Sequence, residues 1–278
     1  MSTTPDEHRA PSASDPPLRL TDRARWGIAM GWASDAEPLL EIGADVELRV
    51  ASASKLLLLA ACAAAVESGD LDPGRRLDRR SVDPVADSGI WQHLDQDLLT
   101  VHDVATLVGA ASDNLATNML LHELGLDRVA STAEALGITG VHLHDRVRDE
   151  RTSAHPQTLG TATARGLFDL ITRVANGTLG DAPTSARVRR WLANSLDLSM
   201  VAAPLHLDPL SHGVGHEGPM VVNKTGTDAG VRADVGFVES GSGTLVYCAI
   251  ANWPAELALT DAVMQDMHAI GEAVRRLL

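Results

Sequence analysis

Ser52-Ala53-Ser54-Lys55-Leu56-Leu57-Leu58-Leu59-Ala60-Ala61-Cys62-Ala63-Ala64-Ala65 is the most informative segment of this 278-residue chain. A helix over residues 52–68 would be apolar on every side, which is typical of a helix that is buried all round. The run is too short to cross a bilayer, which needs roughly 18 or more apolar residues. The sequence therefore predicts a central buried helix with a serine and a lysine at its amino end.

Strand patterns lie on both sides of this helix along the chain, and helical patterns lie between them. Strands are predicted at 26–33, 39–48, 220–225, 232–239 and 244–252. Helices are predicted at 101–109, 112–123, 126–136, 161–176, 184–195 and 261–278, with Thr100 as an N-cap, and a long loop at 141–160. The predicted class is α/β, in the α+β sense: an antiparallel sheet built from both termini and flanked by helices, with an inserted all-helical lobe.

These patterns also predict the domain organisation. Residues 1–20 are polar and rich in proline, and we expect a disordered tail there. Residues 21–50 and 205–278 form the sheet lobe, and residues 51–204 form the helical lobe of one catalytic unit. The tail has no apolar h-region, so no signal peptide is predicted and a cytoplasmic location is expected.

The composition limits the partners. A net charge of −14 without a basic run argues against nucleic acid and against an anionic membrane surface. We expect a monomer that acts on a small molecule. Cys62 and Cys248 are expected to be buried free thiols rather than a disulfide.

Lysine is almost absent from the chain. Only Lys55 and Lys224 occur, against 21 arginines. Arginine stays protonated, whereas a desolvated lysine can lose its proton. The two lysines are therefore expected to perform chemistry that arginine cannot.

Both lysines lie in short motifs that favour acyl transfer. On a helix, Ser52 and Lys55 share one face at i and i+3, where an unprotonated amine could activate the hydroxyl. Ser112 could relay a proton to a leaving nitrogen, and Asn114 could hold a substrate amide. Lys224 could attract a carboxylate and polarise Ser112. The three motifs in this order, S-x-x-K, S-D-N and K-T-G, are far more specific than any one of them.

These motifs resemble those of the penicillin-binding-protein-like serine hydrolases, and most closely those of class A β-lactamases. The resemblance runs from about residue 22 to the C-terminus and includes the 60-residue spacing of Ser52 and Ser112. It implies that Ser52 is the acylated nucleophile, Lys55 its base and Ser112 a proton shuttle. It also implies an oxyanion hole formed by the N–H groups of Ser52 and Thr227.

The same resemblance suggests how substrate is bound. A substrate carboxylate would be held by the K-T-G strand and by an arginine on the next strand: Lys224, Thr225, Gly226, Thr227 and Arg232. Trp91 is expected to line the mouth of the site, or else to be a structural tryptophan. The implied activity is hydrolysis of a β-lactam or related amide, without metal or cofactor. The alternatives are an esterase, amidase or peptidase for an intracellular metabolite, or a β-lactam-binding protein without turnover.

The chain departs from the class A pattern on the loop that follows the S-D-N helices. Class A enzymes carry a glutamate there that activates the deacylating water. An ungapped count places Arg148 at that position, and arginine cannot act as a general base. Slow deacylation is therefore expected, unless a shifted loop lets Asp149 or Glu150 serve as the base, or Lys55 or His155 handles both steps.

Three further features bear on the loop's arginine and on metal binding. The acid that normally pairs with the loop's arginine, here Arg146, is expected to be missing, with Gly160 near its place. His212 and His216 are interpreted as part of a solvated glycine-rich loop rather than as metal ligands. His142 and His144 alternate as on a strand and should share one face, again without a metal.

Overall fold

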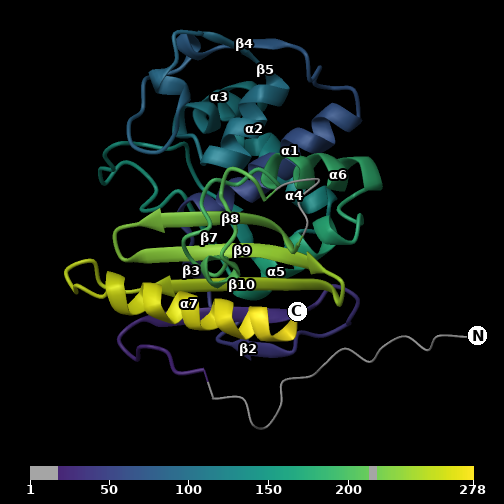
Figure 1. The fold of residues 1–278 in the computed structure, drawn as a ribbon. Coiled ribbons are helices and arrows are strands. Elements are labelled where there is room, and N and C mark those ends of the chain that lie inside the picture. The colour runs from purple at the N-terminus through teal and green to yellow at the C-terminus, as the bar shows by residue number, and fades with distance from the viewer. Residues whose placement is uncertain (1–17, 213–217) are drawn as a thin grey trace, which may run out of the picture.

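A computed structural model describes residues 18–212 and 218–278. Its centre is a five-stranded antiparallel sheet in the order β2-β1-β10-β9-β8 (Figure 1). The sheet consists of β1 (Arg25–Trp32), β2 (Leu40–Ile42), β8 (Met220–Asp228), β9 (Val231–Ser240) and β10 (Gly243–Asn252). Strand β1 pairs with β10 from Arg25↔Asn252 to Trp32↔Leu245, so the two ends of the chain build one sheet, as predicted.

Helices cover both faces of this sheet. Helix α7 (Thr260–Leu277) packs an apolar stripe on one face, and α5 (Ala164–Ala175) lies on the other. The stripe on α7 consists of Val263, Met267, Ile270 and Val274, spaced by three or four residues as one side of a helix requires. Burial on both faces explains why most of β9 and β10 is apolar.

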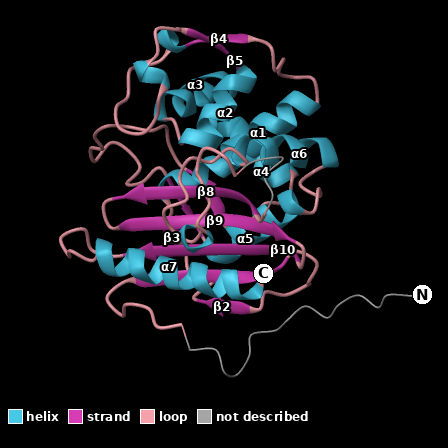
Figure 2. Cartoon of the chain, in the orientation of Figure 1, coloured by secondary structure: helices cyan, strands magenta, loops and turns pink. Residues whose placement is uncertain are grey.

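The remaining helices gather beside one edge of the sheet, next to β8 (Figure 2). At their centre lies α1 (Lys55–Glu67), in which only Ala64 and Glu67 escape full burial. Around it pack α2 (Val101–Ala111), α3 (Asn114–Leu124), α4 (Leu126–Ala135) and α6 (Ala182–Leu192). The predicted buried central helix is confirmed. Thr100 caps α2 through a capping box with Asp103, also as predicted.

Two predictions about the smaller strands were wrong. The predicted strand over 39–48 is broken, because Gly43 adopts φ +54° and starts a turn closed by Val46 N–H to Gly43 O. Its second part becomes β3 (Leu48–Arg49). The predicted loop over 141–160 begins with β6 (Val141–Leu143), which pairs with β7 (Gly160–Ala162), and β7 also pairs with β3. A further pair, β4 (Arg76–Asp78) with β5 (Leu98–Thr100), borders α2.

The ends of the described chain and its cysteines complete the fold. Leu18 and Leu20 pack against the hydrophobic cluster that includes the α7 stripe, and the rest of the predicted tail, residues 1–17, lies outside the described residues. Cys62 and Cys248 are both buried free thiols, as predicted. Within residues 18–212 and 218–278, no helix is both long and apolar enough to span a membrane.

Candidate active site

Ser52 lies in a tight turn at the amino end of the central helix. The turn is a 3-10 helix, Ala51–Ser54, that runs into α1. Ala51 has φ +45°, an uncommon conformation for a residue with a side chain and one that recurs at functional sites. Ser54 stabilises the turn by donating its hydroxyl to Ala51 O at 2.7 Å. The half-buried Ser52 is thereby held at the boundary between the sheet and the helices.

Lys55 lies directly beneath this turn and is completely buried. Its Nζ donates to Ser112 O at 2.7 Å, to Asn114 Oδ1 at 2.9 Å and, more weakly, to Ser112 Oγ at 3.4 Å. Burial, together with the nearby charge of Lys224, lowers the pKa of Lys55 well below its usual value. A lysine with a depressed pKa can accept a proton, which arginine in its place could not.

Ser112 points into the site because the chain reverses there. It ends α2 in the left-handed conformation, with φ +53°. Asp113 then caps α3 by accepting from Ala116 N at 2.9 Å, and it also accepts from Ile90 N and Trp91 N, both at 2.8 Å. One carboxylate therefore fixes both the S-D-N turn and the neighbouring 88–91 loop.

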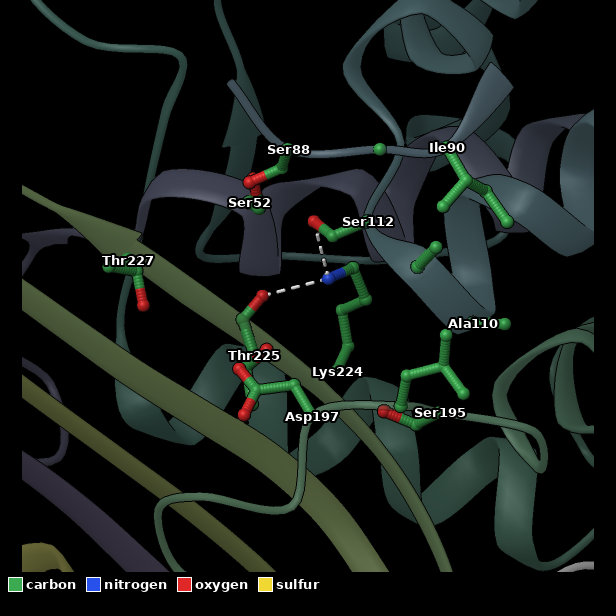
Figure 3. A pocket seen from close by; sticks show the side chains of 13 residues that line it. Ser52, Ser88, Ile90, Ala110, Ser112, Ser195, Asp197, Lys224, Thr225 and Thr227 are labelled. Atoms are coloured by element: carbon green, nitrogen blue, oxygen red, sulfur yellow. Dashed lines mark hydrogen bonds between the residues drawn. The ribbon is translucent and has the colours of Figure 1, made fainter. Parts of the chain in front are cut away.

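Lys224 approaches Ser112 from the sheet side. Its Nζ donates to Ser112 Oγ at 3.0 Å and to Thr225 O at 2.8 Å (Figure 3). Burial lowers the pKa of Lys224 to about 8, although Asp197 and Asp234 act in the opposite direction. The Ser112 hydroxyl thus lies between two buried amines, one from α1 and one from β8.

Gly226 allows β8 to run against the Ser52 turn. A Cβ at this position would lie 2.1 Å from Val50 O, 2.8 Å from Ala53 N and 3.1 Å from Ser52 N. Only glycine fits such a close approach of two backbones. The glycine of K-T-G therefore brings Ser52 next to the strand that carries Lys224 and Thr227.

Two pockets open on either side of Ser52. The first has a volume of about 310 Å³ and lies between the K-T-G strand and the 88–91 loop, with the exposed side chains of Ile90 and Leu196 on its wall. The second, of about 490 Å³, lies toward the 145–151 loop. Ser52 and Thr227 line both pockets. Ser112, Lys224 and Thr225 line the first, and Asn114 and Asp149 line the second.

The 145–151 loop is built around an acid that the sequence interpretation overlooked. Asp145 is buried and accepts from Arg148 Nε at 2.7 Å, from Arg148 Nη2 at 3.0 Å and from Arg151 Nη1 at 2.7 Å. No acid near Gly160 takes part in this pairing: Arg148 and Arg151 pair with Asp145, and Arg146 Nη1 donates to Asp83 Oδ2 at 3.0 Å. Gly160 has another reason to be glycine, because a Cβ there would lie 2.4 Å from the Cβ of Ser54.

This loop places Arg148 and Asp149 beside Ser52. Asn118 fastens it from α3: its Nδ2 donates to Val147 O at 3.0 Å, and its Oδ1 accepts from Val147 N at 2.8 Å. Arg148 and Asp149 line the second pocket, and the Asp149 carboxylate accepts from Ala86 N at 2.9 Å. Glu150 is exposed.

Trp91 does not line the mouth of the site, so its listing as a substrate-binding residue was wrong and the alternative, a structural tryptophan, is the one the structure shows. Its ring is fully buried and its Nε1 donates to Gln96 O at 2.8 Å, which leaves its neighbour Ile90 to face the first pocket. Arg232 is turned toward its own strand end. Its guanidinium donates to Asp228 O at 3.2 Å and to Val231 O at 2.7 Å.

Among the described residues, no histidine, His155 included, lines either pocket. His212 is buried, with Nε2 2.8 Å from Ser195 O, so a solvated position was the wrong expectation for it; His216 lies outside the described residues. The rings of His142 and His144 stack at 5.9 Å, as the strand pattern predicted. Among the described residues, no group of three or more His, Cys, Asp or Glu side chains could hold a metal ion.

The sheet with helices on both faces, and the helical lobe beside it, form the mixed α/β architecture of class A β-lactamases. A family model described as the β-lactamase enzyme family matches residues 21–275. The chain therefore belongs to that family. No curated protein sequence matches the chain significantly.

Several solved structures share the fold. A β-lactamase from Sphaerobacter thermophilus DSM 20745 is 25% identical, with a TM-score of 0.77 and 90% of each chain covered. An ancestral class A β-lactamase is 20% identical, with a TM-score of 0.75 over 92% of this chain and 95% of that one. PBP-A is 19% identical, with a TM-score of 0.72 over 93% of each chain. This chain is similar to proteins of both kinds, β-lactamases and PBP-A.

Proposed function

We propose that this protein is a serine hydrolase that cleaves an amide or ester through an acyl-enzyme on Ser52. The observation that carries the proposal is the pair of buried lysines whose amines meet at Ser112 beside Ser52. β-Lactams are the first substrates to test. An esterase, amidase or peptidase acting on another metabolite would use the same residues.

The chemistry follows from the positions of these groups. Lys55, with its depressed pKa, takes the proton of Ser52 as the hydroxyl attacks the carbonyl carbon. The N–H groups of Ser52 and Thr227 stabilise the oxyanion. Ser112, which both lysines contact, returns a proton to the leaving nitrogen. Asn114, which holds Lys55 and lines the second pocket, positions the acyl side of the substrate.

We propose further that the acyl-enzyme is released slowly. Arg148, which stands where the family resemblance expects a glutamate, is charged and paired with Asp145. The nearest carboxylate on the loop that lines the pocket is Asp149, which already accepts from Ala86 N. A protein that stays acylated would act as a β-lactam-binding protein. The similarity to PBP-A, of which a mutant was solved as an acyl-enzyme complex with penicillin-G, is in keeping with this second candidate.

Labelling with a fluorophosphonate, followed by peptide mapping, tests the nucleophile. The reagent should modify wild type at Ser52 and fail to modify Ser52→Ala. Ser88→Ala is the matched control, because Ser88 lines both pockets but makes no contact with either lysine, and it should be labelled normally. Modification of another serine, or equal labelling of Ser52→Ala, would refute the proposal.

The deacylation step is tested separately. Asp149→Asn and Glu150→Gln should leave the rate of β-lactam hydrolysis unchanged if the loop supplies no base. Glu150 is the control, because both side chains are exposed but only Asp149 lines the second pocket. If the hydrolysis rate fell tenfold or more in Asp149→Asn alone, the loop would supply a base. The proposal that the acyl-enzyme is released slowly would then be wrong.

A further inference from the structure

A carboxylate of the protein itself lies in the first pocket, at the place where substrate carboxylate binding was expected. Asp197 lines this pocket beside Thr225 (Figure 3), and the Thr225 side chain helps to lower the pKa of Asp197. The sequence offered no signal for it, since it lies in a segment without a motif. The hydrogen bonds around Asp197 show that the fold fixes its position.

Three contacts hold Asp197 there. Its Oδ1 accepts from Ser199 Oγ at 2.6 Å and from Ser199 N at 3.1 Å. Its backbone carbonyl accepts from Asn223 Nδ2 at 3.1 Å, and Asn223 directly precedes Lys224. The same strand that carries the K-T-G motif therefore anchors the acid.

Asp197 carries a negative charge at neutral pH. Burial acts to raise its pKa, but hydrogen bonds from Ser199 and Thr225 and the nearby charge of Lys224 outweigh it and bring the pKa below its usual value. The two charges next to the pocket, Lys224 and Asp197, offset each other. The Thr225 side chain, which a bound carboxylate would need as a donor, already contributes to stabilising the Asp197 carboxylate.

The other expected cation is engaged elsewhere. The guanidinium of Arg232 donates to the carbonyls of Asp228 and Val231 and stands over the ring of Trp253 at 5.9 Å from its centroid. Its N–H groups are therefore directed at its own strand end, although Asp197 lies near enough for its charge to raise the pKa of Arg232 against the effect of burial.

We infer, resting on the acyl transfer proposed above, that Asp197 is a specificity-determining residue that selects a carboxamide or peptide amide over a carboxylate beside Lys224. A carboxylate there would meet the like charge of Asp197. A carboxamide would accept from Lys224 through its oxygen and donate to Asp197 through its N–H. The substrate class is then an acyl donor in which the group held by the K-T-G strand is uncharged, in place of the carboxylate that the family resemblance implied.

Two compounds that differ only in this group test the inference: benzylpenicillin and its primary carboxamide. The second-order rate of Ser52 acylation is measured for each by intact-protein mass spectrometry. Wild type should react about tenfold or more faster with the carboxamide. Asp197→Asn should accelerate the reaction with benzylpenicillin and remove this preference. Asp261→Asn, an equal charge change at the exposed start of α7, should keep it.

The outcomes separate the two proposals. Equal rates on wild type, a preference for the carboxylate, or a failure of both compounds while a fluorophosphonate still labels Ser52 would overturn the role of Asp197 and leave acyl transfer standing. The comparison on wild type decides this even if Asp197→Asn does not fold. Absence of Ser52 labelling by the fluorophosphonate would refute the proposed function itself.

Discussion

Among the lysines and arginines of residues 18–212 and 218–278, only Lys55 and Lys224 are fully buried, and both contact Ser112. A buried ammonium is costly, and the protein lowers that cost by letting the amine lose its proton. The 21 arginines, in contrast, stay protonated and provide permanent positive charge. The depressed pKa of Lys55 is therefore the property on which the proposed nucleophile depends.

Lys55→Arg tests this dependence. Arginine keeps a positive charge and can donate to Ser112 O, but it cannot accept the Ser52 proton. Acylation by benzylpenicillin should fall by about a hundredfold or more. Stopped reactions analysed by mass spectrometry give the rate, and circular dichroism checks the fold. An arginine variant that reacts within a few fold of wild type would exclude Lys55 as the base.

The sequence predicted the motif residues because S-x-x-K, S-D-N and K-T-G are local patterns. It did not reveal Asp197 or the role of Asp145, because each acts through partners that only the folded chain brings near it. The family resemblance also suggested Trp91 at the mouth of the site, with a structural tryptophan as the alternative. The register of the 88–91 loop, set by Asp113 and not by the tryptophan, turns Ile90 outward instead.

Among the larger elements, the 145–151 loop depends most on a single side chain. Asp145 is the common acceptor for Arg148 and Arg151, and those hydrogen bonds lower its pKa to about 2 against the opposing effect of burial. A carboxylate with a lowered pKa stabilises the fold above its unfolded pKa of about 3.9, and this stabilisation is lost as the pH falls toward 2.

Asp145→Asn should therefore reduce the free energy of unfolding by about 2 kcal/mol at pH 7, because two guanidinium groups lose their charged partner while remaining partly exposed. Urea unfolding at pH 7 and at pH 3 measures the effect. The difference between wild type and variant should shrink at the lower pH. A difference that is constant across this range would contradict the assigned pairing.

Strand β9 carries a buried acid, Asp234, whose pKa is shifted in the opposite direction to that of Asp145. Asp234 is fully buried and accepts from Val201 N at 3.0 Å and Asn223 Nδ2 at 3.0 Å. Burial raises its pKa to about 7, although these hydrogen bonds act against the shift. An acid with a raised pKa contributes to the free energy of unfolding while it is protonated. This contribution is fully present below about pH 3.9 and is lost as the pH rises through about 7.

Wild type should consequently lose stability between pH 4 and pH 8 relative to Asp234→Asn, by up to roughly 4 kcal/mol for a shift of about three units. Urea unfolding of both proteins at pH 4.5, 6 and 8 gives the difference directly. Parallel curves for the two proteins would show that Asp234 does not titrate in this range.

The sequence predicted helices and strands correctly where burial produces a hydrophobic pattern over many residues. The central helix α1 and the strands β1, β9 and β10 were predicted to within a few residues. The prediction failed where a local turn or a strand partner distant in the sequence decides the secondary structure. A glycine turn at Gly43 divides one predicted strand, and β6 exists because β7 pairs with it.

Across the whole molecule, the sheet and the helical lobe meet most closely where β8 passes the Ser52 turn. Gly226→Ala would place a methyl group 2.1 Å from Val50 O, so one of the two backbones must move. We expect a loss of about 2 kcal/mol in the free energy of unfolding and a tenfold or greater loss in the acylation rate. Thermal unfolding and labelling of Ser52 measure both effects.

Gly241→Ala is the matched control, because a Cβ at that hairpin position would meet nothing within 4 Å. It should change neither stability nor labelling appreciably. If Gly226→Ala were equally neutral, the close approach of the strand to the nucleophile turn would not be needed for activity.

Time-resolved intact-protein mass spectrometry with benzylpenicillin, on wild type and on Ser52→Ala, follows acylation and release in one experiment. The proposed function predicts one penicilloyl adduct on wild type that accumulates and persists after free drug is removed, and none on Ser52→Ala. An adduct on both proteins would contradict Ser52 as the nucleophile. An adduct that disappears as hydrolysed penicillin forms would contradict slow release and identify an efficient β-lactamase.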